Sequence, residues 1–225
     1  MLLERWSGYT PVVRAEALST LTGRTAWARA LLDAVASRQV AVSHIDAPRR
    51  VLLLKSRDPQ VQKRARELFG DLARTPRAEL VAKYRPALAS KGDAARGRAV
   101  FERDCASCHI SGGVGHNVGP SIAAMGTKTP ETLLVNILDP NREVDPRYLN
   151  YTLVTRDGRV ATGIIAGETD TSVVLRRADG ASETILRTQI DELSSTGQSL
   201  MPEGLEQKIN PQEMADLIAY LMSTS

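Results

Sequence analysis

Cysteine is almost absent from this 225-residue sequence: there are two, and they lie three positions apart. A framework of structural disulfides is therefore excluded if one short motif uses both thiols. Aromatic residues are also scarce, at 4% of the chain, which favours aliphatic packing between helices over an aromatic-rich β-sandwich. No apolar run approaches the roughly 18 residues of a membrane-spanning helix, so we predict no transmembrane segment.

The net charge of +3 is small, but it conceals two halves of opposite sign. Residues 1–92 contain 17 Lys and Arg against 8 Asp and Glu, whereas residues 93–225 contain 12 against 18. This asymmetry predicts two units with different surfaces. Because the positive charges are spread singly along helical segments, we interpret them as a solvated face and a docking surface for the acidic half. We expect no nucleic-acid partner.

Residues 1–90 have the pattern of short helices. Ranges 11–21 and 59–69 share one spacing: Pro, then Val two positions later, Ala six later, and Leu or Phe ten later. Thr10 and Asp58 precede the two prolines, where N-caps belong. The 48-residue offset is close to the period of about 40–47 residues in HEAT-type repeats. We therefore predict a HEAT-like helical region over residues 1–90, with a generic small α-bundle as the alternative.

Both cysteines lie in Cys105-Ala-Ser-Cys108-His109, which has the C-x-x-C-H spacing of a c-type haem attachment site. Two thiols about one helical turn apart can both add to the vinyl groups of one haem, and the adjacent histidine can then bind the iron. A zinc site would need four ligands, and only His44 and His116 remain as conventional partners. A thioredoxin-type pair should follow a strand, whereas a helix is expected here. The motif predicts one covalent haem c held by Cys105 and Cys108, with His109 on the iron.

Three helices are expected in the second half of the chain. The first covers residues 94–104 and is capped by Asp93. The second covers 130–138 and the third begins at the capping box 210–213. Residues 148–187 instead show strand periodicity around two Asp-Gly turns. We predict a mainly α protein in which residues 93–225 form a haem domain, with a small antiparallel β meander or SH3-like element inserted at 148–187.

The iron needs a sixth ligand or an open site. Met214 and Met222 lie eight residues apart on the expected last helix, which is the spacing of core residues. Met201 lies instead in a loop before a proline, so it is our preferred ligand. His116 is the leading alternative. The remaining candidates are Met125 and His44.

A histidine bound to a metal usually donates its other ring N–H to an acceptor, which fixes the orientation of the ring. Pro120 has a carbonyl and no N–H, and it ends a glycine-rich loop that can pass close to the ring. We therefore expect the Pro120 carbonyl to accept from His109. Arg142, Arg147 and Tyr148 are candidate partners for the haem propionates, because they follow the helix expected to line the pocket.

Several motifs in order resemble a known family. They are Gly97-Arg98-x-x-Phe101, Cys105-x-x-Cys108-His109, Gly119-Pro120, Ile137-Leu138-Asp139-Pro140, Asp157-Gly158 with Gly163, Ser199-Leu200-Met201-Pro202-Glu203-Gly204-Leu205, and Asp216-Leu217-Ile218-Ala219-Tyr220-Leu221. Residues from about 93 to 224 are similar to the haem-binding domain found in Planctomycetes and Verrucomicrobia, a variant of the class I cytochrome c fold. The resemblance implies His109 and Met201 as axial ligands and Pro120 as the partner of His109. It also implies that a helix bearing Gly97 and Phe101 crosses a helix bearing Tyr220.

Proteins of this family typically carry the domain at the C-terminal end of a larger periplasmic protein, after helical repeats and a dehydrogenase-like β-propeller. Met1–Trp6 lacks a secretory signal, and haem c is attached outside the cytoplasm. We therefore expect an exported, periplasmic location and a chain that is part of a larger protein.

The expected function is transfer of single electrons from a linked or partner dehydrogenase, without catalysis by this chain itself. Two alternatives remain open. One is an open-site haem protein that binds a diatomic ligand or peroxide, as a sensor or an enzyme. The other is a docking scaffold formed by the helical region.

Overall fold

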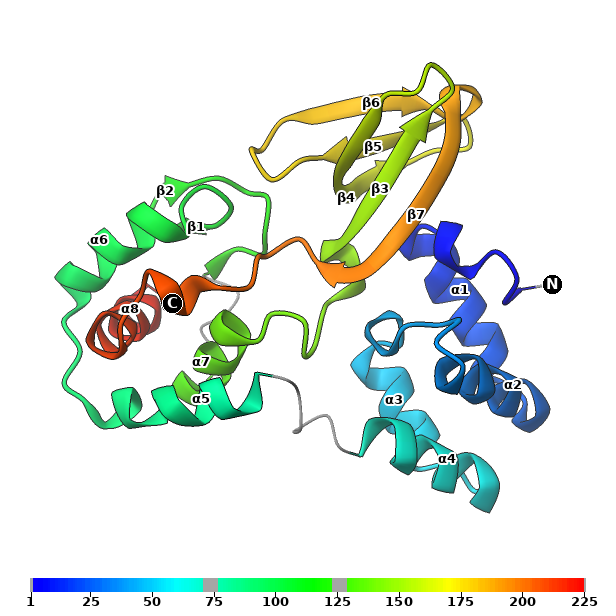
Figure 1. The fold of residues 1–225 in the computed structure, drawn as a ribbon, viewed down its shortest axis with the longest axis horizontal. Helices are drawn as coiled ribbons and strands as arrows, with labels where there is room; N and C mark the ends of the chain where they lie inside the picture. Colours follow the sequence, from blue (N-terminus) through cyan, green and yellow to red (C-terminus); the bar gives the residue numbers. More distant parts are fainter. Residues whose placement is uncertain (1, 71–76, 123–128, 225) are drawn as a thin grey trace. The chain divides into compact units, whose positions relative to one another are not determined.

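The computed structural model of the chain describes residues 2–70, 77–122 and 129–224 (Figure 1). The chain divides into two compact units. Unit 1 contains Met1–Arg74, Asn141–Leu175 and Glu183–Ser199, and unit 2 contains Thr75–Pro140, Arg176–Ser182 and Leu200–Ser225. Within the described ranges, no helix is long and apolar enough to span a membrane.

Four helices form the N-terminal part of unit 1: α1 (Pro11–Thr22), α2 (Thr25–Ala36), α3 (Ala47–Leu54) and α4 (Pro59–Phe69), with short 3-10 turns η1 (Trp6–Gly8) and η2 (Val42–His44). The first turns of α1, α3 and α4 each contain a proline and are capped by the side chains of Thr10, Asp46 and Asp58. The two predicted helices at 11–21 and 59–69 are thus present. Their arrangement as HEAT-like repeats stays a prediction.

The apolar faces of these helices form one core. Its members are largely aliphatic: Ala17, Leu18, Leu21, Leu31, Leu32, Val35, Val61, Ala65 and Phe69, with Trp6. The two similar helices differ at one matched position, because Val61 is buried whereas Val13 is 44% exposed. The shared sequence pattern therefore does not give the two helices identical surroundings.

The predicted β segment forms a five-stranded sheet. Most of it belongs to unit 1, whereas Arg176–Ser182 belong to unit 2. The strands are β3 (Leu149–Thr155), β4 (Val160–Glu168), β5 (Ser172–Arg176), β6 (Ser182–Leu186) and β7 (Ile190–Ser199), in the order β6-β5-β4-β3-β7. Short turns η5 (Pro146–Tyr148) and η6 (Arg187–Gln189) precede β3 and β7. Strand β3 lies between β4 and β7 and pairs antiparallel with both.

The sheet is larger than predicted, because β7 extends it from residue 187 to residue 199. The polar sequence of β7 lacks the apolar alternation that marks β3, where Leu149, Tyr151 and Leu153 are all buried. Only Ile190 and Leu193 of this strand pack against the core of the sheet, and its pairing with β3 holds the rest. Periodicity alone therefore could not detect it.

Buried polar contacts join the sheet to the N-terminal helices within unit 1. The Arg14 guanidinium donates to the Tyr151 hydroxyl at 2.9 Å, and Ser195 Oγ lies 3.0 Å from Nε2 of His44. The sheet therefore groups with the N-terminal helices, whereas the predicted domains placed it inside residues 93–225.

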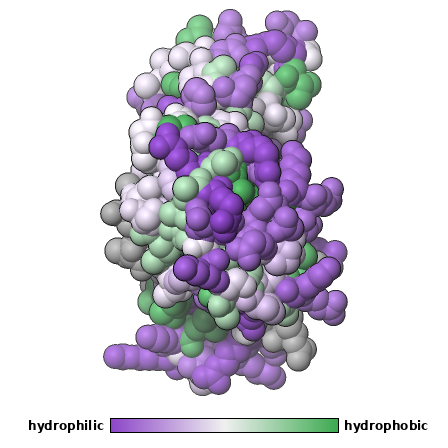
Figure 2. Space-filling model, turned by 90° about the vertical axis from the view of Figure 1, so that its left-hand side faces the viewer, coloured by the Kyte–Doolittle hydropathy of each residue, from purple (hydrophilic) through white to green (hydrophobic). Residues whose placement is uncertain are grey.

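Unit 2 contains α5 (Ala78–Tyr84), η3 (Arg85–Ala89), α6 (Ala94–Asp104), β1 (Ile110–Ser111), β2 (Val114–Gly115), α7 (Pro130–Leu138), η7 (Leu205–Gln207) and α8 (Pro211–Ser223). Although residues 1–90 were predicted as one helical region, α5 and η3 belong to unit 2, and Val81, Tyr84 and Ala87 join its core. The boundary expected at residue 90 therefore differs from the division of the structure, which lies near residue 75. On the face shown in Figure 2, hydrophilic residues predominate, with smaller hydrophobic patches between them.

Helices α6 and α8 lie side by side and pack at very short range (Figure 1). A Cβ on Gly97 would lie 1.9 Å from the carbonyl oxygen of Asp216, so only glycine permits this approach. The rings of Phe101 and Tyr220 pack beside it, with centroids 5.5 Å apart. This is the helix crossing that the resemblance implies.

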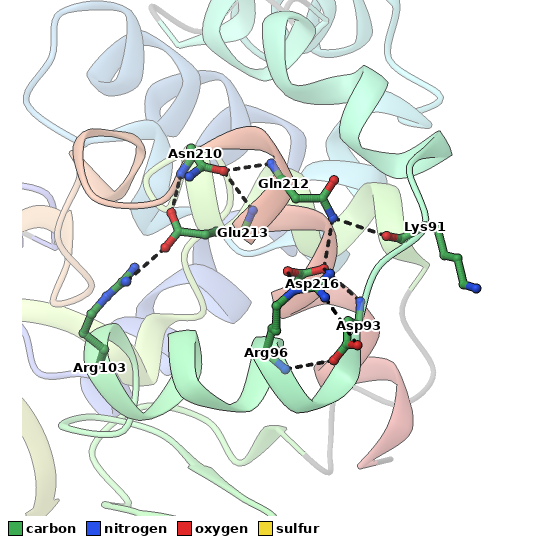
Figure 3. A network of polar contacts seen from close by, with 8 residues as sticks. All are labelled: Lys91, Asp93, Arg96, Arg103, Asn210, Gln212, Glu213 and Asp216. Atoms are coloured by element: carbon green, nitrogen blue, oxygen red, sulfur yellow. Dashed lines mark hydrogen bonds and ion pairs between the residues drawn. The ribbon is translucent and has the colours of Figure 1, made fainter.

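A buried carboxylate reinforces the crossing (Figure 3). Asp216 is 2% exposed and accepts from Nε and Nη2 of Arg96 at 2.7 and 2.9 Å. It also accepts from the backbone N–H of Asp93 at 2.8 Å and from Gln212 at 3.0 Å. Hydrogen bonding by Arg96 is the main reason that the pKa of Asp216 is lowered. The N-terminus of α6 is thereby tied to the middle of α8.

Candidate haem site

The C-x-x-C-H motif folds as a single turn at the C-terminal end of α6. Cys105 is the C-cap of that helix, and its N–H donates to Phe101. The N–H groups of Cys108 and His109 both donate to the carbonyl oxygen of Cys105, at 3.0 Å each. All five residues of the motif are therefore placed by α6, which is itself fixed against α8.

The two thiols are free and half-buried, but their surroundings differ. Cys105 packs against the core of unit 2, and burial raises the pKa of its thiol to about 12. The Sγ of Cys108 lies 3.6 Å from the carbonyl oxygen of Ala178, in the loop between β5 and β6. One thiol thus faces the core, and the other faces a hairpin loop.

His109 is buried, with 8% of its surface exposed. Its Nδ1 lies 2.9 Å from the carbonyl oxygen of Pro120, so the structure brings these two predicted residues together. Because a carbonyl only accepts, Nδ1 is the donor and Nε2 keeps its lone pair. Burial lowers the pKa of His109, and the bond to Pro120 opposes that shift. A neutral imidazole with one free nitrogen is the form that binds a metal.

The glycine-rich loop brings Pro120 to His109 through backbone hydrogen bonds to the motif itself. The N–H groups of Val118 and Gly119 donate to the carbonyl oxygen of Cys108 at 3.0 and 2.7 Å. A Cβ on Gly119 would lie 2.4 Å from Cε1 of His109, so the imidazole packs directly on that backbone. The loop therefore orients the ring both by contact and by a hydrogen bond.

The residues present fit a covalently attached haem. Two free thiols lie on one turn, and the adjacent imidazole has its Nδ1 hydrogen-bonded and its Nε2 available. The close seat of the ring on Gly119 leaves no room for a side chain between the loop and the histidine.

The candidate sixth ligands have different surroundings. Met201 lies in the loop between β7 and η7, in unit 2, and is half-buried. Met214 is fully buried in the core, whereas Met222 is 38% exposed. His116 is exposed on the glycine-rich loop. Met125 lies outside the described residues.

His44 differs from the other candidates because it belongs to unit 1. Its Nδ1 accepts from the indole of Trp6 at 2.9 Å, and its Nε2 lies 3.0 Å from Ser195 Oγ. Both ring nitrogens are therefore engaged within unit 1. Met201 as the axial ligand stays a prediction, with His116 as the alternative in the same unit as His109.

The residues proposed for the propionates are not in the same compact unit as His109. Arg142 and Tyr148 are half-buried residues of unit 1. Arg147, also in unit 1, pairs with Asp145 at 2.7 Å and lies over the ring of Tyr148. A role for these three side chains in haem binding stays a prediction.

The loop between β5 and β6 contacts the motif although only its Asp179-Gly180 turn, and not this contact, is predictable from the sequence. Residues Arg176–Ser182 belong to unit 2, and Ala178 contacts Cys108. A turn motif specifies local backbone conformation but carries no information about its distant partner, so no signal in the sequence indicated this contact.

A comparison with known protein families points to the part of the chain that contains the C-x-x-C-H motif. Residues 92–148 match the family described as Cytochrome C oxidase, cbb3-type, subunit III. This match supports a cytochrome c domain that carries covalently bound haem and transfers electrons. No curated protein matches the chain.

Proposed function

We propose that this chain is a monohaem c-type cytochrome that passes single electrons. The observation that carries the proposal is the environment of His109: Nδ1 is committed to the Pro120 carbonyl at 2.9 Å, and Nε2 is left with its lone pair. This arrangement, next to two free thiols on one turn, is what a haem iron requires from its protein ligand. The family match over residues 92–148 supports the same conclusion.

Each residue of the site has a separate role. Cys105 and Cys108 would hold the haem through two thioether bonds. His109 would bind the iron, and the Pro120 carbonyl would hold the imidazole in one orientation and increase its basicity. Met201 would provide the second ligand to the iron. When bound with His and Met ligation, a haem supplies a one-electron redox centre whose potential is raised by the methionine.

The partner we propose is a dehydrogenase, either linked to this chain in one protein or separate from it, in an exported compartment such as the periplasm. The resemblance of residues 93–224 supports this choice of partner. We propose that the chain transfers electrons and is not catalytic alone.

The number of haems and the attachment points can be tested together. The chain would be exported in a host that matures c-type cytochromes, and its mass would be measured under denaturing conditions. We expect one covalent haem in the wild type and none in the Cys105→Ala, Cys108→Ala double variant. Ser107→Ala is the matched control, because it changes the same turn and keeps both thiols. A haem-free wild type, or a double variant that keeps the haem, would contradict the proposal.

The sixth ligand is tested by the absorption spectrum of the ferric protein. We expect a methionine-to-iron charge-transfer band that disappears in Met201→Ala and persists in Met222→Ala. A wild-type spectrum of high-spin iron would overturn the electron-carrier proposal and favour an open site for a diatomic ligand or peroxide. Loss of a low-spin spectrum in His116→Ala alone would assign the ligand to His116.

A further inference from the structure

The loop between β5 and β6 is a hydrogen-bonded turn that contacts the C-x-x-C-H motif. The Gly180 N–H donates to the Arg177 carbonyl at 3.0 Å, and the Arg177 N–H donates to the Ala181 carbonyl at 2.9 Å. Gly180 has φ of +84°. This is the pattern of a three-residue hairpin loop that ends in a left-handed glycine. The loop is therefore a well-defined structural element and can support its neighbours.

Two contacts join this hairpin to the motif and to the loop that follows it, both within unit 2. Nη1 of Arg176 donates to the carbonyl oxygen of Asn117 at 2.9 Å. The Ala178 carbonyl lies 3.6 Å from Sγ of Cys108. The hairpin thus contacts both the attachment turn and the backbone of Asn117.

The contacted residues directly precede the group that orients His109. Asn117 and Val118 are followed by Gly119 and Pro120, and the N–H groups of Val118 and Gly119 donate to the Cys108 carbonyl. Through this short segment, a side chain on β5 is linked to the hydrogen bond between Pro120 and the imidazole.

The glycine-rich loop at residues 111–120 is costly to order, so contacts from outside the loop should help to hold it. Residues 111–120 contain four glycines, three of which have positive φ: Gly112, Gly113 and Gly115. Glycine backbone loses more conformational entropy on ordering than any other. Val118 is the one apolar side chain of this loop that is buried, with 3% exposed. The charge-assisted hydrogen bond from Arg176 to the Asn117 carbonyl therefore holds the glycine-rich loop next to Val118, where the loop packs against the motif.

We propose that Arg176 is a positioning residue of the haem site: through Asn117 it holds the segment that presents the Pro120 carbonyl to His109. The inference rests on the proposed function and deepens it by extending the site to the β5–β6 hairpin. A looser segment would weaken the bond to Nδ1, make the imidazole less basic and shift the reduction potential upward.

The first test is hydrogen exchange at the backbone amides of Val118 and Gly119 in the full chain, measured with and without haem. Arg176→Ala removes the hydrogen bond to Asn117 and also the bond from Nε to Ser182 Oγ at 3.2 Å. Loss of the support at Asn117 should accelerate exchange at these amides roughly tenfold. Arg176→Lys keeps a donor and should restore much of the protection. Arg159→Ala is the matched control, because this arginine pairs with Glu183 on the same sheet at 2.7 Å.

The second test is the reduction potential of the haem-loaded protein. The potential should rise in Arg176→Ala, return towards the wild-type value in Arg176→Lys and stay unchanged in Arg159→Ala. A potential that does not move while exchange accelerates would overturn the positioning role, because the contact would then serve only the loop. Unchanged exchange in Arg176→Ala, or equal acceleration in Arg159→Ala, would also overturn it. If no haem attaches, the proposed function fails separately, since exchange in the haem-free chain still tests the contact.

Discussion

Two histidines of this protein are almost equally buried, yet they are used in opposite ways. His44 and His109 are 4% and 8% exposed, and burial lowers the pKa of both. In His44 the indole N–H of Trp6 donates to Nδ1, so a neutral ring must carry its proton on Nε2 and donate it to Ser195. Both nitrogens are then used.

In His109 the donor and acceptor nitrogens of the ring are exchanged. Nδ1 donates to the Pro120 carbonyl, and Nε2 remains as an acceptor. The two rings teach that burial does not distinguish a structural histidine from a ligand. The partner of Nδ1 decides: a donor there makes His44 a structural bridge in unit 1, and an acceptor there makes His109 a candidate ligand in unit 2.

The largest expected effect is the loss of iron ligation at one of these histidines. His109→Ala should abolish the low-spin spectrum of the haem-loaded protein, because we propose that its imidazole binds the iron. His44→Ala should leave that spectrum intact. Absorption spectra of the two variants test this difference. A low-spin spectrum that is lost in His44→Ala and kept in His109→Ala would contradict the assignment of His109 as the ligand.

The free energy of unfolding should depend strongly on His44, although the haem spectrum should not. His44→Ala removes a buried ring and leaves the Trp6 indole N–H without an acceptor, which should lower the free energy of unfolding by about 3 kcal/mol. The measurement is urea unfolding of the full chain followed by Trp fluorescence. Gln39→Ala is a useful control, because it also removes a side-chain hydrogen bond in unit 1, but at an exposed position. Equal losses in the two variants would show that the His44 bridge is not structural.

The pH dependence of stability should also depend on His44. Burial, and then the Arg14 charge, lower the pKa of His44 to about 3 in the folded protein. An unfolded histidine titrates near 6.5, so the unfolded state binds the proton more readily. The contribution of His44 is full above about pH 6.5 and is lost as the pH falls towards 3. Between pH 7 and pH 5 this loss should be about 2 kcal/mol.

His44→Gln provides the comparison for this titration, since glutamine has no ionisation in that range. Unfolding curves at pH 5, 6 and 7 should show a smaller pH dependence in the variant than in the wild type. Parallel pH profiles in the two proteins would mean that His44 is not held neutral by its surroundings.

The smallest effect should come from the backbone that supports His109. Gly119→Ala places a Cβ 2.4 Å from the imidazole, which must shift, at a cost of about 1–2 kcal/mol. Gly167→Ala in β4 meets only ordinary contacts at 3.8 Å and serves as the control. Thermal unfolding would compare the two variants, and the spectrum of the haem-loaded protein would report any displaced imidazole. A Gly119→Ala protein as stable as Gly167→Ala would argue against close packing of the ring.

The helices were predictable where their determinants are local. Thr10, Asp58 and Asn210 cap helices from positions adjacent to their prolines, and each cap is formed in the structure. The Asp157-Gly158 and Asp179-Gly180 turns likewise end in glycines with positive φ. Strand β7 was not predictable, because its partner β3 lies about 40 residues earlier in the chain.

The attachment turn and its histidine partner follow from sequence alone, because short hydrogen-bonded loops close them: residues 105–109 form one turn, and Pro120 returns to His109 over eleven residues. Loop closure over such distances costs little entropy, so local residue types determine it. Only the tertiary structure decided which distant groups support the site. Asp216 reaches the start of α6 across 120 residues, and Arg176 reaches Asn117 across 59. Such contacts depend on how whole elements pack, and no short pattern of residues records that packing.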